Sequence, residues 1–292
     1  MSGFFNKREF LRLLGSATVA APTAIITSKA TQKTEASKPT EPAYERVMRT
    51  NTLRCGYGFW EPGFSKNLET GQLTGIFYDY MNAIGQHTGL KVEYTEELGW
   101  GDFPAALNSG RIDAMCFGAW PKAHMAREVL FTEPTYYLPI DAYARSSDNR
   151  FDHEPLKINS PDVKISVMDS ELSSELARTT FPKAQTLSVP QLSPAGTLLL
   201  NVSSGKADIT FTDACTGAAF MAKNPGQVKV VPFDRPLRLY GHTIPVGKSE
   251  HSLVSLLNTA TDEIVSSGEF ESIVLKYEKI PGVLLMQKPQ YQ

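Results

Sequence analysis

The sequence predicts an α/β protein built from two similar lobes with a ligand cleft between them. From Thr52 onward, short β-branched runs alternate with segments whose apolar residues recur at helical spacing. Two segments also echo each other: residues 109–118 (SGRIDAMCFG) and 204–213 (SGKADITFTD) each follow a predicted helix and open a strand with Arg or Lys, one residue, then Asp. Strands separated by helices imply right-handed crossovers and mostly parallel sheets, here one sheet in each lobe.

The first set of elements runs from a strand that ends in glycines to a strand that precedes the loop FGAWPKAHM. Glycine at the helix ends and Pro104 near a helix start support the helix boundaries. The expected strands cover residues 53–58, 90–96 and 111–118, and the expected helices cover residues 75–89 and 103–110.

The same rhythm restarts after Tyr136 and Tyr137. Ser170 or Ser173 is suited to cap the first helix of this second set. The expected strands cover residues 163–169, 184–189, 206–213 and 228–233, and the expected helices cover residues 170–182, 194–205 and 213–226. The segment 241–248 and two final helices, 252–268 and 270–279, follow.

Composition excludes several classes of function. The apolar and charged fractions, 41% and 21%, are those of a soluble globular protein, and the net charge of −2 lacks the basic excess of a nucleic-acid-binding surface. The five histidines show no metal-ligand spacing, so no metal and no cofactor are expected. Of the cysteines, Cys55 and Cys116 each follow strand residues and a bridge between them is conceivable, but the sequence favours buried thiols for all three, Cys215 included.

The first 30 residues have the features of a secretory signal: a basic segment, a short apolar run that contains Pro22, and small residues near Ala30. Lys7-Arg8 with Phe10-Leu11 resembles the twin-arginine export signal with Lys in the place of the first Arg, so the twin-arginine and general secretory routes both stay open. Residues 31–44 read as a polar linker. We therefore expect a periplasmic protein, cleaved before the linker and without a lipid anchor.

Two lobes predict a binding site on the loops at the carboxyl ends of the strands. These loops are residues 57–64, 117–125, 169–173 and 213–215. The last two lead directly into helices, whose N-terminal N–H groups favour negative or acceptor groups.

From about residue 50 to 282 the chain resembles the family 3 extracytoplasmic solute-binding proteins, which serve mostly amino-acid ABC importers. The resemblance rests on LRCGYGFWEPGF, GQLTGIFYDYMNAIGQHTGLKVEY, FPAALNSGRIDAMCFG, AREVLFTEPTYY, the SSGKADITFTD segment and the C-terminal LLNTATDEIVSSGEFESIVLKYEKIPG. It implies the type II periplasmic-binding-protein fold, with lobe one at residues 45–142 plus 235–292 and lobe two at residues 143–234. It also implies a monomer that passes a small ligand to a membrane permease.

The resemblance places the ligand residues of amino-acid binders on this sequence one at a time. The Arg that grips the ligand carboxylate falls on Met125, and the hydroxyl positions of the same loop fall on Gly118 and Trp120. Arg127 and Lys122 stay open as replacements for that Arg. In lobe two the ammonium-binding Asp is kept as Asp213.

Two further positions complete the expected site. The Gly-Thr that helps hold the carboxylate reads Ser170-Glu171, and Trp60 and Glu61 lie where the family presents an aromatic ring. Carboxylates and aromatic rings together suit an amine or quaternary ammonium ligand, which is the preferred reading over an amino acid. Glu61 as a rim charge, Trp120 as core and Glu171 as a first-turn helix charge remain open alternatives.

The same fold allows two other functions. A cyclohexadienyl-type dehydratase acts on carboxylates, and binding them would require the missing Arg. The sequence also contains no nucleophile motif. A soluble ligand sensor is the remaining alternative. The sequence therefore predicts a binding protein and not an enzyme.

Overall fold

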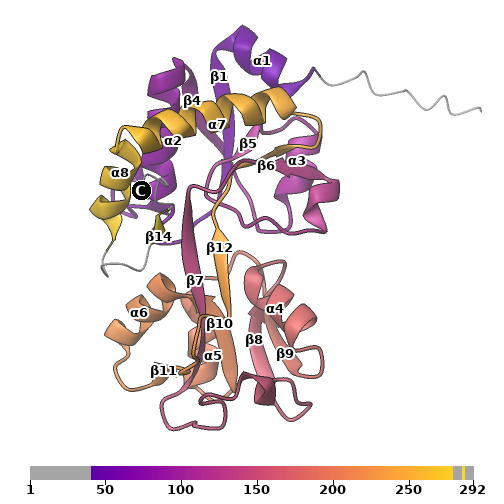
Figure 1. The fold of residues 1–292 in the computed structure, drawn as a ribbon, viewed down its shortest axis with the longest axis vertical. Helices are drawn as coiled ribbons and strands as arrows, with labels where there is room; N and C mark the ends of the chain where they lie inside the picture. The colour runs from indigo at the N-terminus through magenta and orange to yellow at the C-terminus, as the bar shows by residue number, and fades with distance from the viewer. Residues whose placement is uncertain (1–40, 279–284, 287–292) are drawn as a thin grey trace, which may run out of the picture. The chain divides into compact units, whose positions relative to one another are not determined.

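The structure is a computed structural model that describes residues 41–278 and 285–286, so the expected signal over residues 1–30 lies outside the described part. Two sheets with their helices form what we call lobe 1 and lobe 2 (Figure 1). In lobe 1 the strand order is β4-β1-β5-β13-β6, and in lobe 2 it is β11-β7-β10-β8-β9. The two-lobed α/β class predicted from the sequence is confirmed.

Lobe 1 takes its elements from both ends of the described chain. Its strands are β1 (Thr52–Tyr57), β4 (Lys91–Glu97), β5 (Ala114–Met115), β6 (Val129–Phe131) and β13 (Pro245–Gly247). Its helices are α1 (Ala43–Thr50), α2 (Ile76–Thr88), α3 (Phe103–Asn108), the short 3-10 helix η1 (Met125–Arg127), α7 (His251–Ser266) and α8 (Glu269–Tyr277), with a small hairpin of β2 (Ser65–Lys66) and β3 (Leu73–Thr74). Helix α1 begins inside the stretch expected as linker.

Lobe 2 comes mostly from the middle of the chain. Its strands are β7 (Tyr136–Arg145), β8 (Lys164–Met168), β9 (Gln185–Val189), β10 (Ile209–Asp213) and β11 (Val228–Val230), and β12 (Arg238–Gly241) and β14 (Leu285–Met286) also pair with β7. Its helices are η2 (Pro155–Ile158), α4 (Leu172–Thr180), α5 (Gly196–Ser203) and α6 (Ala214–Lys223).

The sheets are parallel where a helix connects two strands and antiparallel where the chain passes between the lobes. Strand β1 pairs in parallel with β4 and β5, and β8 pairs in parallel with β9 and β10. Strands β13 and β7 run antiparallel to their neighbours, because they belong to the segments that leave or re-enter a lobe. The expectation of mostly parallel sheets thus holds for the βα units, and the sheets as a whole are mixed.

Strands β7 and β12 form the connection between the two cores. Tyr136 and Leu138, at the start of β7, are buried in the core of lobe 1, whereas Ile140 and Ala142 are buried in the core of lobe 2. Strand β12 runs antiparallel beside β7, with Gly241 opposite Tyr137. The chain therefore crosses between the lobes on two adjacent, hydrogen-bonded strands.

The repeated Arg/Lys-x-Asp motif has a structural role that is the same in each lobe. Asp113, just before β5, accepts a hydrogen bond from the backbone N–H of Arg54 at 2.7 Å, and Asp208, just before β10, accepts one from the backbone N–H of Lys164 at 2.9 Å. Each carboxylate thereby fixes the neighbouring parallel strand, and each is also paired with arginines. The motif that repeats in the sequence therefore makes the same hydrogen bond between neighbouring strands in each lobe.

Cys55 and Cys116 form a disulfide bond, with 5.4 Å between their Cα atoms. The sequence favoured separate buried thiols, and that expectation is wrong. Cys55 lies in β1 and Cys116 directly follows β5, its immediate neighbour in the sheet, and the N–H of Cys116 bonds the carbonyl of Gly56 at 2.8 Å. The two side chains come within bonding distance because their strands are adjacent in the sheet. The order of the strands determines this closeness, and the sequence spacing does not.

Thiol counting tests this disulfide. The chain has three cysteines, so the protein denatured without reductant should react with one equivalent of thiol reagent, at Cys215, and with three after reduction. The double variant Cys55→Ala/Cys116→Ala should lose about 2–5 kcal/mol of unfolding free energy, whereas Cys215→Ser should keep the disulfide. Three reactive thiols before reduction would contradict the bond.

Candidate functional site

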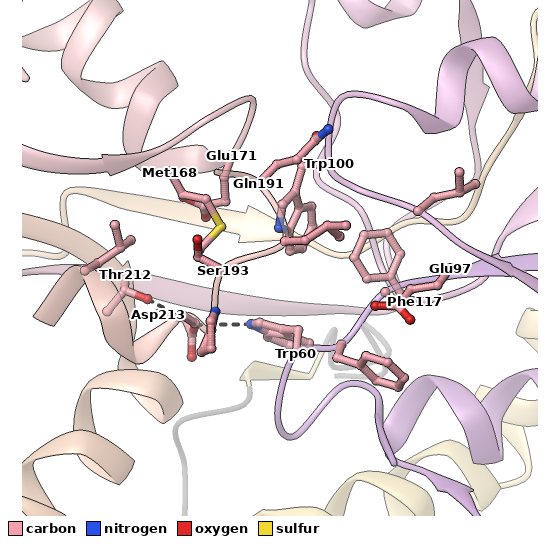
Figure 2. Close-up of a pocket in the computed structure, with 17 residues that line it drawn as sticks. Trp60, Glu97, Trp100, Phe117, Met168, Glu171, Gln191, Ser193, Thr212 and Asp213 are labelled. Carbon is pink, nitrogen blue, oxygen red and sulfur yellow. Dashed lines mark hydrogen bonds between the residues drawn. The ribbon is translucent and has the colours of Figure 1, made fainter. Parts of the chain in front are cut away.

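A cavity of about 280 Å³ lies between the lobes and is lined by both of them. Figure 2 shows its walls, with the loops after β1 and β4 on one side and the loops around β8, β9 and β10 on the other. Lobe 1 contributes Trp60, Glu97, Trp100 and Phe117, and lobe 2 contributes Met168, Glu171, Gln191, Ser193, Thr212 and Asp213. The lining side chains include three carboxylates and several rings, and no Lys or Arg is among them.

Asp213 ends β10 and caps helix α6. Its Oδ1 accepts from the N–H of Thr216 at 2.8 Å, and its Oδ2 accepts from the Thr216 hydroxyl at 2.7 Å. Oδ2 also accepts from Trp60 Nε1 at 3.3 Å, as Figure 2 shows. The side chain is buried, and burial raises the pKa of its carboxyl group while these hydrogen bonds oppose the rise. Asp213 is therefore a rigid carboxylate held by lobe 2 and bonded across the cleft by lobe 1.

Glu171 occupies the equivalent position at helix α4. Its Oε2 accepts from the N–H of Ser173 at 2.8 Å and from the Ser173 hydroxyl at 2.6 Å, so its side chain caps its own helix. Burial raises the pKa of the Glu171 carboxyl group, opposed chiefly by the Ser173 bonds and by the charge of Lys122. Both carboxylates that lobe 2 presents to the cavity thus sit at helix N-termini, where the backbone dipoles favour negative charge.

A buried, neutral histidine connects the aromatic residues of lobe 1. His242 follows β12, its Nδ1–H donates to the carbonyl of Gly118 at 3.2 Å, and its Nε2 accepts from Trp120 Nε1 at 3.2 Å. The Trp60 ring lies 5.1 Å from the His242 ring. Burial lowers the pKa of His242 to about 3, which keeps the ring neutral, and the two hydrogen bonds fix its tautomer.

Trp100 lines the cavity, and Trp120 lies behind it. The two indole rings stack with centroids 5.2 Å apart and planes inclined by 3°. Trp120 is buried with the core of lobe 2 and does not line the cavity, although it comes from the loop of lobe 1 that the sequence singled out. Its role in this structure is to support Trp100.

The expected site residues divide into three groups. Trp60, Glu171 and Asp213 line the 280 Å³ cavity, which we call the main cavity because the expected carboxylates and ring meet there. A second, larger cavity of about 500 Å³ also touches Glu171, and Met125 and Ser170 line it. Glu61, Gly118 and Trp120 line neither.

Gly118 shapes the loop from below the cavity. It has φ +80°, and a Cβ there would lie 2.1 Å from the Phe77 ring. A larger residue would therefore both strain the backbone and collide with the core. The loop position that carries a hydroxyl in amino-acid binders is thus closed to any side chain here.

The residues that line the cavity and that the sequence did not predict include Glu97, Trp100, Gln191 and Ser193. They lie at or just beyond the carboxyl ends of β4 and β9. The rule that places ligand groups at strand ends, applied to these two strands as well, would have found them.

Two side chains fasten the lobes to each other near the cavity. Gln191 Oε1 accepts from the N–H of Gly101 at 2.8 Å, and its Nε2 donates to Asp102 at 2.7 Å. Lys122 Nζ donates to the carbonyl of Ser170 at 2.5 Å. Arg127 is exposed and lines neither cavity.

The described residues show no cluster of three or more His, Cys, Asp or Glu side chains that could hold a metal ion. Within the same residues, no helix combines the length and apolar character that crossing a membrane requires.

Comparison with known proteins now identifies the family. The family model for bacterial extracellular solute-binding proteins, family 3, matches residues 53–279. The chain belongs to this family. The family 3 relatives include a probable amino-acid ABC transporter-binding protein of Haemophilus influenzae, 24% identical over 80% of this chain and 87% of the relative. A probable histidine-binding protein of Neisseria gonorrhoeae is 26% identical over 71% of this chain and 75% of the relative.

Solved structures of similar proteins share the two-lobed fold of this family 3 chain. An ancestral amino acid-binding protein, a precursor of cyclohexadienyl dehydratase, has a TM-score of 0.69 and 24% identity over 82% of this chain and all of that chain. A solute receptor for L-cysteine from Neisseria gonorrhoeae has a TM-score of 0.70 and 16% identity over 83% of this chain and 99% of that chain. At these identities the likeness is one of fold.

The neutral state of His242 predicts a pH dependence of stability. Below the ordinary histidine pKa of 6.5, His242 is protonated in the unfolded chain. In the folded protein it stays neutral down to about pH 3. The contribution of His242 is therefore complete above pH 6.5 and falls as the pH drops, by up to ~1.4 kcal/mol per unit. Urea unfolding of the wild type and of His242→Gln, at several pH values from neutral to acid, measures it.

The expected result is a gap in unfolding free energy that is widest at neutral pH and narrows below pH 6.5. The wild type and the variant carry the same other titratable groups, so the effects of those groups cancel in the difference between the two unfolding free energies. Parallel pH profiles for the two proteins would contradict a neutral His242.

Proposed function

We propose that this family 3 protein binds a small organic cation without a free α-carboxylate, as an amine or a quaternary ammonium compound, and delivers it to the membrane permease of an ABC importer. It acts as a monomer in the periplasm and not as an enzyme. The family assignment and the transporter-binding names of the relatives support the importer role. The charge of the cavity supports the choice of ligand.

One observation carries the choice of a cation: the carboxylate of Glu171 occupies the N-terminus of α4. Free N–H groups at this helix end would suit a ligand carboxylate, but Ser173 N–H is already bonded to Glu171 at 2.8 Å. The protein thus supplies its own carboxylate where an amino acid would place one. A second carboxylate beside it would be repelled.

The remaining positions do not replace the missing cation partner. Met125, at the expected position of the carboxylate-binding Arg, is a buried apolar side chain in the second cavity. Lys122 is bonded to Ser170 and lies near Glu171 and Glu175. A ligand carboxylate buried in the main cavity without a cationic partner would cost several kcal/mol.

The proposed roles follow from these positions. Glu171 and Asp213 supply negative charge, and Trp60 supplies a ring face and the cross-lobe bond to Asp213. Trp120 acts through Trp100, on which it stacks. Gly118 allows the close approach of Phe77. Ser170 closes the cleft through Lys122, and Glu61, outside both cavities, adds negative charge to the same loop as Trp60.

A thermal-shift screen tests the ligand class. The panel contains L-amino acids, the amines formed by their decarboxylation, and choline-like compounds. A ligand at 100 times its Kd should stabilise the protein by about 2.7 kcal/mol, a visible rise in Tm. We expect amines or quaternary ammonium compounds to raise the Tm. Stabilisation by L-amino acids alone would reject the cation proposal and return the function to amino-acid binding.

Isosteric variants of the two capping carboxylates test the charge. Asp213→Asn and Glu171→Gln should weaken binding of a cation hit by about 2–5 kcal/mol in isothermal calorimetry, because each removes one partner of a buried charge pair. Asn still caps a helix, so Asp213→Asn should fold.

Glu250→Gln is the matched control. Glu250 also accepts backbone N–H bonds, from Ala43 at 2.8 Å and Tyr44 at 3.0 Å, but it does not line the main cavity. Binding by this variant should match the wild type. Unchanged affinity in both cavity variants would show that their charges do not face the ligand.

A further inference from the structure

Three polar side chains that line the cavity already form hydrogen bonds within the protein. Asp213 accepts bonds on both oxygens, three of them from Thr216 and Trp60. Glu171 accepts two bonds on Oε2. Both ends of the Gln191 amide are engaged, with Gly101 and with Asp102. The other acceptor positions of the lining carboxylates, on Glu171 Oε1 and on Glu97, belong to opposite lobes.

Rings and apolar side chains form much of the remaining wall. Trp60, Trp100 and Phe117 line the cavity, and the Trp100 and Phe117 ring centroids are 4.5 Å apart (Figure 2). Phe59 of lobe 1 and Leu192 of lobe 2 also line it, and they are 44% and 62% exposed. Large apolar side chains are thus left in contact with solvent on both sides of the cavity, where a ligand would cover them.

We propose that the cationic group of the ligand is a methylated ammonium, tertiary or quaternary, and not a primary amine. This inference rests on the proposed function, because it narrows the class of cation. A primary ammonium carries three N–H donors, and each needs an acceptor when it is buried. A quaternary ammonium has none to satisfy, and its methyl groups pack against rings while its charge is attracted by the ring faces.

The two helix-capping carboxylates suit this group in a second way. Their charges attract a cation through the low-dielectric cavity without requiring a direct hydrogen bond. Because Thr216 and Ser173 hold the carboxylates in place, they are poorly free to turn toward an N–H donor. The site therefore selects by charge and shape, with little directional bonding.

Two methylation series in isothermal calorimetry on the wild-type protein test the inference. One runs from ethanolamine through its N-methyl and N,N-dimethyl forms to choline, and the other from butylamine to butyltrimethylammonium. In each series that binds, the affinity should rise with every added methyl group, by about tenfold or more from the primary amine to the trimethyl form. The neutral analogue 3,3-dimethylbutan-1-ol should bind at least about tenfold more weakly than choline, because it keeps the shape and lacks the charge.

Trp100 provides a readout that a merely structural role would not move. In Trp100→Leu the ratio of choline affinity to that of the neutral analogue should fall about tenfold, since the ring face attracts only the charged compound. Trp100→Phe keeps a ring and should lose less of this ratio. A loss shared equally by both compounds would mean that Trp100 only packs.

The outcomes separate the two proposals. Tightest binding by the primary amine overturns the methylated-ammonium inference but leaves the cation proposal standing. Equal binding of choline and its neutral analogue also overturns the inference. Failure of both series to bind at millimolar concentration also overturns the inference. If L-amino acids bind under the same conditions, the proposed function fails as well.

Discussion

The arrangement of the site depends on His242 remaining neutral in the core. It lies at the end of a connecting strand, donates to Gly118 in the loop after β5, and accepts from Trp120. Its ring also contacts Trp60 and stacks on Tyr136 of β7, with centroids 4.6 Å apart. A charged imidazolium could not accept the Trp120 bond, so the neutral ring is needed to hold the loop, both connecting strands, the cavity residue Trp60 and the supporting residue Trp120 together.

The two lobes use one architectural unit for two different purposes. In each, a helix, a Ser-Gly stop and an Arg/Lys-x-Asp strand place an aspartate against the neighbouring strand, Asp113 in lobe 1 and Asp208 in lobe 2. After that strand the lobes diverge. Lobe 2 turns directly into α6 with Asp213 as its cap, whereas lobe 1 continues through Gly118 into a long loop. The repeated motif positions the same strand in each lobe, and the two lobes differ in the segment that follows it.

The sequence could predict what is local, and it failed where three-dimensional neighbours decide. Hydrophobic periodicity located most helices and strands of the βα units but not α1, and the strand-end rule brought Trp60, Glu171 and Asp213 to one cavity. The Cys55–Cys116 bond was missed because only the order of strands makes β1 and β5 adjacent. The position of Trp120 behind Trp100 was equally hidden, since both follow strand ends and only packing decides which ring reaches the cavity.

Glu171 also explains why a ligand carboxylate would not simply displace it. The Glu171 side chain is tethered one residue before α4, so its carboxylate meets the Ser173 N–H at the effective concentration of an intramolecular partner, far above that of any free ligand. Displacing it would also leave a buried carboxylate with only Lys122 near it, and Lys122 is already bonded to Ser170. Binding a positively charged group beside Glu171, with Glu171 left in place, costs less free energy than displacing it. Under the proposed function, a side chain that occupies the place of a ligand's own carboxylate would turn a fold shared with amino-acid-binding proteins toward cations.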